Sequence, residues 1–172
     1  MLDTLLILFF PFLMAFAAAS DLVSMTISNK ISMTLITGFM VFAVWMQMDL
    51  ETIGWHWAMF GIVLAVSFSL FALNVIGGGD AKLVAAASLW FGWEHTMDYI
   101  LIFAIMGGLM ALVILRLRSI PLPDRIANVG WIARLYRADS GVPYGVALGA
   151  AAIFVYPQTP WMQHVFLAAR TL

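Results

Sequence analysis

Two aspartates, Asp21 and Asp80, stand at the ends of long apolar stretches of the sequence, 59 residues apart. An acidic side chain near the hydrocarbon of a membrane costs about 2.5–3.5 kcal/mol on insertion scales, so its presence there indicates a function. Two carboxylates held close together do not both ionise easily, and one stays protonated while the other acts as a base. Such a pair can activate water and protonate a leaving amine without metal or cysteine, which is the chemistry of an aspartic protease.

Three glycines, Gly77, Gly78 and Gly79, directly precede Asp80. Glycine destabilises helices and supplies no side chain for packing, so the three residues predict a break between two helices. They would also let an extended substrate backbone approach Asp80 closely. Local alternatives remain open: Asp80 could cap the following helix, the glycines could form a turn or a helix contact, and Asp21 could be an ordinary charge at a helix end.

The composition indicates an integral membrane protein. Of the 172 residues, 64% are hydrophobic and 10% are charged, and the mean hydropathy is +1.01. Soluble domains contain only about 45–50% apolar residues. The chain has no basic tract, which argues against nucleic acid as a partner. It also has no cysteine, which excludes disulfides, thiolate nucleophiles and cysteine-based metal sites.

The apolar runs predict an all-α fold of about six transmembrane helices in one multi-pass domain covering residues 1–172. A span needs roughly 20 residues and tolerates about 17. The fourth run is short by this measure and predicts a thin or partial span, while residues 161–172 suit a helix at the membrane surface. Trp90 and other tryptophans near the ends of runs are interpreted as interfacial anchors. The predicted spans are residues 4–20, 31–48, 55–76, 81–94, 98–116 and 142–157.

The charged residues separate the two sides of this arrangement. With the N-terminus outside, seven of the eight basic residues fall on one side, which the positive-inside rule assigns to the cytoplasm. These seven are Lys30, Lys82, Arg116, Arg118, Arg125, Arg134 and Arg137. The loops of the opposite side hold Asp3, Asp49, Glu51, Glu94 and Asp98. Asp21 and Asp80 then reach the same depth on the cytoplasmic side, where they could face each other across a shallow, wetted cavity.

Three sequence elements carry a resemblance to a known family. Gly77 to Asp80 reads G-x-G-D, within Gly-Gly-Gly-Asp-Ala-Lys-Leu, and Asp21 is followed by Ile27-Ser28-Asn29. Pro143-Tyr144-Gly145 opens the last predicted span. Together they resemble the prepilin peptidases, which are G-x-G-D membrane aspartic proteases. In that family an Ile-Pro-Asn element follows the first catalytic aspartate, and Ser28 replaces the proline here.

The resemblance implies an aspartic endopeptidase of the bacterial inner membrane, without a cofactor, that cuts prepilins at the cytoplasmic face. Asp21 and Asp80 would be the catalytic pair. The implied substrate has a basic leader followed by a hydrophobic helix, and the lipid bilayer and the pilus assembly machinery are further expected partners. Larger members also N-methylate the pilin through a domain with paired cysteines between the first two helices. This chain has a short connection there and resembles the minimal peptidases of tight-adherence (Flp) pili.

Other residues are expected to shape the site rather than to react. Asn29 is expected to order the loop after Asp21 by bonds to the backbone, with substrate contact as the alternative. Lys82 could tune a carboxylate, but snorkelling to the cytoplasmic surface is favoured. Tyr144 belongs to the element that opens the last span. No metal site is expected, because His56, His95 and His164 lack ligand-like spacing.

Two alternatives to the protease remain at the level of sequence. A small ion- or proton-coupled transporter also uses acids, but near the middle of the membrane and often within paired repeats. A non-catalytic assembly subunit of a pilus or secretion system would tolerate asparagine at both positions. Residues 117–141, basic and partly aromatic, suit a helix at anionic headgroups or a segment that receives the substrate.

Overall fold

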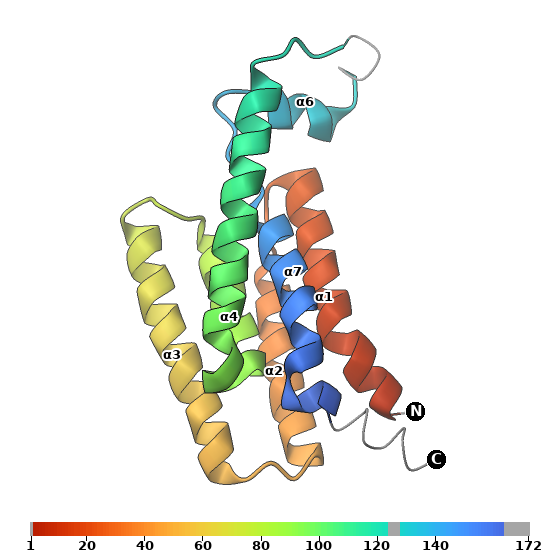
Figure 1. Ribbon diagram of the computed structural model, residues 1–172, viewed down its shortest axis with the longest axis vertical. Coiled ribbons are helices and arrows are strands. Elements are labelled where there is room, and N and C mark those ends of the chain that lie inside the picture. Colours follow the sequence, from red (N-terminus) through yellow and green to blue (C-terminus); the bar gives the residue numbers. More distant parts are fainter. Residues whose placement is uncertain (1, 124–127, 164–172) are drawn as a thin grey trace.

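The computed structural model describes residues 2–123 and 128–163. Every regular element in these ranges is a helix, which confirms the predicted all-α fold class. The elements are α1 (Leu2–Ser24), α2 (Asn29–Trp45), α3 (Leu50–Ala72), α4 (Gly78–Arg118), α6 (Gly130–Tyr136), α7 (Tyr144–Val155) and a 3-10 helix at Tyr156–Gln158. They form an elongated bundle of α1, α2, α3, α4 and α7, with the short α6 at one end (Figure 1).

The long helices have the length and apolarity of membrane spans. Within the described ranges, three helices meet both criteria: Leu5–Ser24, Leu50–Ala72 and Gly78–Arg118. The helices Asn29–Trp45 and Tyr144–Gln158 are apolar but shorter. The membrane character expected from the composition agrees with these helices, whereas the count of six spans and the outside N-terminus stay predictions.

The fourth and fifth predicted spans are joined without the expected loop. Residues 81–94 and 98–116 belong to one helical run, α4, whose only non-helical backbone angles are at Gly92 (φ 61°, ψ −161°). The two halves of α4 turn back on each other at this residue (Figure 1). A side chain at Gly92 would be strained by the positive φ and would stand 2.7 Å from Cε1 of His56. Glycine therefore makes the reversal within one residue.

Two helix boundaries differ from the prediction in ways that matter for the site. α1 continues past residue 20 to Ser24, so Asp21 lies in its last turn and not after its end. Met25 then adopts a positive φ of 55° and ends the helix. α3 begins at Leu50 rather than near residue 55, because Asp49 caps it by accepting a hydrogen bond from the Thr52 N–H at 2.9 Å.

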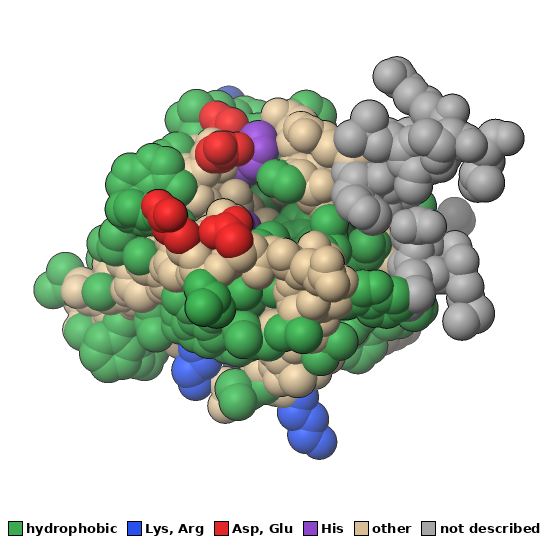
Figure 2. Space-filling view, turned by 90° about the horizontal axis from the view of Figure 1, so that it is seen from below, with side chains coloured by type: hydrophobic (Ala, Val, Ile, Leu, Met, Phe, Trp, Pro, Cys, Tyr) green, Lys and Arg blue, Asp and Glu red, His purple; other side chains and the backbone are tan. Residues whose placement is uncertain are grey.

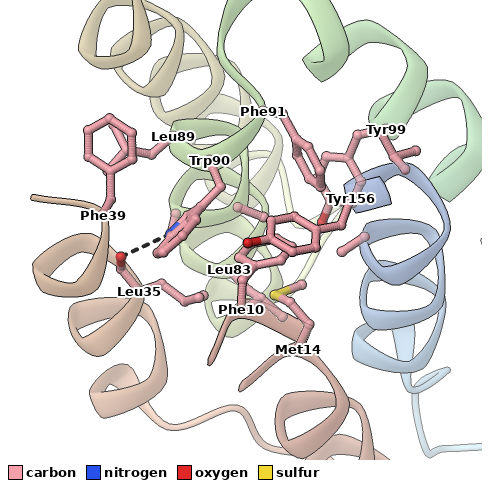
Figure 3. Close-up of a cluster of buried hydrophobic side chains, with 14 of the residues drawn as sticks. Phe10, Met14, Leu35, Phe39, Leu83, Leu89, Trp90, Phe91, Tyr99 and Tyr156 are labelled. Carbon is pink, nitrogen blue, oxygen red and sulfur yellow. Dashed lines mark hydrogen bonds between the residues drawn. The ribbon is translucent and has the colours of Figure 1, made fainter. Parts of the chain in front are cut away.

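The core of the bundle is built around Trp90, which is fully buried. Its indole N–H donates to the carbonyl of Leu35 at 3.0 Å, and the ring of Phe10 packs against it at a centroid distance of 5.2 Å (Figure 3). Tryptophan is stable inside a core when its N–H finds such a partner. The prediction that Trp90 is an anchor at the membrane surface is therefore wrong.

The chain after α7 returns to the same core. Trp161 is 1% exposed, and its indole N–H donates to the carbonyl of Trp90 at 2.8 Å. The predicted surface helix at 161–172 is thus wrong for its first residue, since burial of the large ring outweighs its preference for an interface. Residues 164–172 of that predicted helix lie outside the described residues.

Two arginines hold α6 against the bundle. The guanidinium of Arg118 donates to the carbonyls of Leu135, Ser140 and Gly141 at 2.8–3.0 Å. Arg134 donates to the carbonyl of Val23, at the end of α1, at 2.9 Å. These side chains therefore bind the protein's own backbone, whereas the sequence suggested contact with lipid headgroups or substrate for this segment. Residues 124–127 of the segment lie outside the described residues.

The end of the bundle away from α6 is acidic. Figure 2, which looks at this end, shows acidic side chains gathered around a histidine. The connection between α2 and α3, with Asp49, and the first turn of α3, with Glu51, lie at this end. The reversal of α4, which Glu94 follows, lies here as well (Figure 1). Among the described residues, Lys30, Lys82 and Arg118 belong to the other end, and the side of the membrane that each end faces stays a prediction.

Candidate functional site

Asp21 is held by the start of a helix that is distant in sequence. Its side chain is 6% exposed, and its Oδ2 accepts a hydrogen bond from the backbone N–H of Gly145 at 2.7 Å. Gly145 lies in the first turn of α7, where backbone N–H groups have no partner inside the helix. The carboxylate at the end of α1 therefore satisfies one of these donors and fixes α1 against α7.

Close packing between α1 and α7 leaves no room for a side chain at Gly145. A methyl group there would stand 2.8 Å from Cβ of Asp21 and 2.9 Å from Cδ1 of Ile27. One turn later, a methyl group at Gly149 would stand 2.7 Å from the carbonyl oxygen of Met14. Small residues let helix backbones approach in this way. The two glycines thus set the distance between α1 and α7.

Asp80 lies in the first turn of α4, next to the three glycines. Gly77 is the N-cap residue of this helix, and a methyl group on it would stand 2.9 Å from Oδ2 of Asp80. A methyl group on Gly78 would stand 3.2 Å from the ring of Phe71, and one on Gly79 3.2 Å from Cβ of Ile27. The glycines therefore fit closely against side chains of the same chain, in addition to any approach of a substrate.

Ile27, in the connection between α1 and α2, lies between the residues that neighbour Asp21 and those that neighbour Asp80. It contacts Gly79, which precedes Asp80, and it also contacts Gly145, which binds Asp21. Gly145 in turn donates to the carboxylate of Asp21, so Ile27 lies against residues next to both acids. Three segments that are far apart in the sequence thus converge at one end of the bundle.

A hydrogen bond between Lys82 and Asn29 links two of these segments directly. Nζ of Lys82, two residues after Asp80, donates to Oδ1 of Asn29 at 2.9 Å. Asn29 is the first residue of α2, and Ser28 caps that helix by accepting a hydrogen bond from the Lys30 N–H at 3.3 Å. The side chain of Asn29 therefore binds Lys82 rather than the loop backbone, and Lys82 binds protein rather than only extending to the membrane surface.

Asp80 also lines a large cavity between α3, α4 and α7. Its volume is about 570 Å³. In the described part of the chain, Asp80 is the only charged residue of the lining, which also includes Tyr144. The ring of Tyr144 packs edge-on against Phe103, with ring centroids 6.5 Å apart. Asp80 and Tyr144 thus share one cavity, and Asp21 is not part of its lining.

His56 has a partner of its own, away from the two candidate carboxylates. His56 is buried in α3, where its Nδ1 lies 2.7 Å from the carbonyl oxygen of Leu89. In residues 2–123 and 128–163, no group of three or more His, Cys, Asp or Glu side chains is placed to hold a metal ion. His164 lies outside the described residues.

The structure adds two residues that the sequence reasoning did not select. Gly145 donates to Asp21, and Ile27 lies against both Gly145 and Gly79, whereas only Tyr144 and Asn29 of these elements were predicted to be site residues. The signal was present, since both residues belong to the elements Pro143-Tyr144-Gly145 and Ile27-Ser28-Asn29. What the sequence does not provide is the packing of α1 on α7.

A family model and several known proteins each match part of this chain. A family model described as the type IV leader peptidase family matches residues 8–112. Over 67 residues, the chain is 36% identical to the prepilin leader peptidase/N-methyltransferase of Pseudomonas aeruginosa and 34% identical to that of Aeromonas hydrophila. Each match covers 36% of this chain and 23% of the relative, so about a quarter of the relatives' length is represented. No solved structure matches.

Proposed function

The chain belongs to the type IV leader peptidase family, and on this premise we propose that it is a membrane aspartic endopeptidase that removes the leader peptides of type IV prepilins. The observation that carries the proposal is the convergence at Ile27, which brings the surroundings of Asp21 and Asp80 together. Both acids lie within the residues that the family model matches.

The proposed chemistry needs one proton shared by two carboxylates. The ionised acid takes a proton from water, and the water oxygen attacks the carbonyl carbon of the scissile peptide bond. The protonated acid stabilises the developing charge on the carbonyl oxygen. The carbon–nitrogen bond then breaks, and the leaving nitrogen receives the proton that the first acid took from water. Because Asp80 lines the cavity and Asp21 is held by Gly145, the substrate would reach Asp80 first.

The remaining site residues are proposed to position the acids. Gly77, Gly78 and Gly79 fit the start of α4 closely against Phe71 and Ile27. The bond between Lys82 and Asn29 fixes the same turn of α4 to the start of α2. Tyr144 lines the cavity together with Asp80.

The short connection between α1 and α2 supports a minimal, Flp-type peptidase without methyltransferase activity. Only Met25–Ser28 separate the two helices. The sequence has no cysteine, whereas the methylating members described above use a domain with paired cysteines at this point. We therefore propose an Flp-type prepilin as the substrate.

The distribution of charge supports a site on the cytoplasmic face of the bacterial inner membrane. Lys30, Lys82 and Arg118 belong to the end of the bundle that contains the two acids and α6. Acidic side chains gather at the opposite end (Figure 2). The positive-inside rule places the basic end in the cytoplasm.

Co-expression with an Flp-type prepilin tests the proposal. The wild-type chain is expected to shorten the prepilin, while Asp21→Asn and Asp80→Asn, which keep the size of the side chain, leave the precursor at full length. Asp98→Asn is the matched control, because Asp98 is an exposed acid of the same helix α4. Membrane levels of all variants are measured by immunoblot, so that loss of protein is distinguished from loss of activity.

Three outcomes would contradict the proposal. A full-length precursor in the presence of wild type would exclude the peptidase activity on this substrate. Normal processing by both asparagine variants would favour an assembly subunit instead. A methyl group on the new N-terminus, detected by mass spectrometry in a strain without other prepilin peptidases, would contradict the absence of methyltransferase activity.

A further inference from the structure

The cavity beside Asp80 has long walls on α3 and on the second half of α4, and Tyr144 and Leu148 of α7 complete its lining. On α3 its wall is formed by Ile62, Val66 and Leu70, which are spaced four residues apart. On the second half of α4 it is formed by one stripe: Met97, Ile100, Ala104 and Gly108. From Met97 to Gly108 this stripe extends over about three helical turns, or roughly 16 Å. This groove is thus long enough to accommodate about three turns of another helix.

The lining of the groove is apolar along its length and polar at one end. Ser67 also lines it, but its hydroxyl donates to the carbonyl of Ala81 at 3.1 Å. Asp80 enters from the end at which α3 stops and α4 begins. Val66 and Met97, in the two opposite walls, are 56% and 61% exposed. In hydrocarbon, a peptide occupant must satisfy its own backbone, which a helix does.

The part of α4 that lines the groove has its smallest residues, Gly107 and Gly108, close to Asp80. A methyl group on Gly108 would meet no atom within 4 Å, and one on the preceding Gly107 would contact only side-chain atoms, of Tyr144 at 3.3 Å and of Phe103. Small residues at a helix surface allow a second helix to come close. A partner helix would therefore approach most closely at the level of Tyr144 and Asp80.

We propose that this groove seats the apolar transmembrane helix of the substrate and delivers the peptide bond preceding that helix to Asp80. The inference rests on the proposed function. A lipid chain would also fit the apolar walls, but its phosphate would then lie beside the carboxylate of Asp80, where like charges repel. A peptide segment is neutral at the bond to be cut. The continuity of the groove with Asp80 therefore favours the helix as the occupant.

Filling the groove tests the inference. Gly108→Leu places a side chain in the groove, whereas Gly61→Leu, on α3, is the matched control, because Gly61 does not line the groove and a methyl group on it also meets no atom within 4 Å. Each variant is assayed on the full-length prepilin and on a short peptide that spans the cleavage site without the helix. Gly108→Leu is expected to lower kcat/KM for the prepilin roughly tenfold more than for the peptide. Gly61→Leu is expected to leave kcat/KM unchanged for both the prepilin and the peptide.

Equal losses on both substrates would overturn the inference, because the variant would then disturb the carboxylates themselves. An unchanged rate on the prepilin would also overturn it and would indicate that lipid fills the groove. If wild type cleaves neither substrate, the proposed function fails instead, which is a separate outcome.

Crosslinking provides a measurement that does not depend on catalysis. Since the chain has no cysteine, Ile100→Cys introduces a single thiol in the groove, and Leu101→Cys introduces one on the neighbouring residue, which is 61% exposed and does not line the groove. With an Asp80→Asn background and a cysteine in the prepilin helix, Ile100→Cys is expected to form the disulfide-linked complex and Leu101→Cys is not. Equal crosslinking by the two variants, or crosslinking by Leu101→Cys alone, would refute the proposal that the groove binds the substrate helix.

Discussion

Replacing Gly145 with alanine disturbs the contact between α7 and Asp21, because the backbone N–H of Gly145 donates to the Asp21 carboxylate. The added methyl group would stand 2.8 Å from Cβ of Asp21, whereas ordinary contacts begin near 3.4 Å. Asp21 must therefore move by about 0.6 Å, the difference between these distances, or α7 must move away from it. Overpacking of this kind costs about 1–3 kcal/mol of folding stability. A displacement approaching 1 Å at a reacting group lowers the rate by up to roughly 100-fold.

We expect Gly145→Ala to lower kcat for prepilin cleavage roughly 10- to 100-fold, with a smaller change in KM, because the groove beside Asp80 is not altered. The assay uses purified protein in detergent micelles, a prepilin substrate and a gel or mass readout of the product. Thermal unfolding of the same samples gives the change in stability.

Two glycine variants separate loss of stability from loss of the carboxylate position. Gly149→Ala creates a clash of the same size at the interface of α1 and α7, 2.7 Å from the Met14 carbonyl oxygen, without touching Asp21. Gly61→Ala adds a methyl group in open space outside the groove. Cleavage by Gly145→Ala within about threefold of wild type would refute the reasoning, as would equal losses of kcat in Gly145→Ala and Gly149→Ala.

Two further predictions concern polar contacts at the opposite ends of the bundle. Lys82→Ala and Asn29→Ala should each lower kcat about fivefold, since a hydrogen bond of this kind contributes about 1 kcal/mol. The double variant should lose no more activity than either single variant. Additive losses of kcat, or a similar loss in Lys30→Ala, would show that the bond between Lys82 and Asn29 is not the cause. Hydrogen bonds from the N–H and the hydroxyl of Thr52 hold the pKa of Asp49 below its usual value of 3.8. The ionised Asp49 therefore stabilises the fold above pH 3.8, and this stabilisation is lost as the pH falls through the lowered pKa. Asp49→Ala should therefore melt at a lower temperature than wild type near neutral pH and converge with it in acid; a constant difference in melting temperature across this range would contradict the assignment.

The helices were predictable because a membrane span needs a long apolar run, which sequence composition shows directly. The boundaries depended on local signals of unequal strength. Asp49 followed by Glu51 is a helix start that the sequence contains, and it was passed over in favour of the apolar run. The reversal at Gly92 was not predictable, because one glycine within a helical stretch is compatible with either a continuous helix or a turn.

For the candidate site, the sequence identified the two acids from their types and surroundings, and the structure brings their neighbours together. It did not identify Gly145 as the donor to Asp21, because that bond depends on how closely α1 and α7 pack. The partner of Lys82 was also missed, since 53 residues separate it from Asn29. The catalytic roles of both acids stay predictions until the asparagine variants are assayed.

The hydrogen bond between Asp21 and Gly145 also has a consequence for biogenesis. The chain is synthesised from α1 onward, so Asp21 enters the membrane long before its donor, 124 residues later, has been made. Residues 8–112, which contain both acids, lack this donor. Asp21 therefore gains this hydrogen bond only after α7 has been made and has packed against α1. A nascent chain that stalls before Tyr144 is left with both carboxylates and without the geometry that relates them.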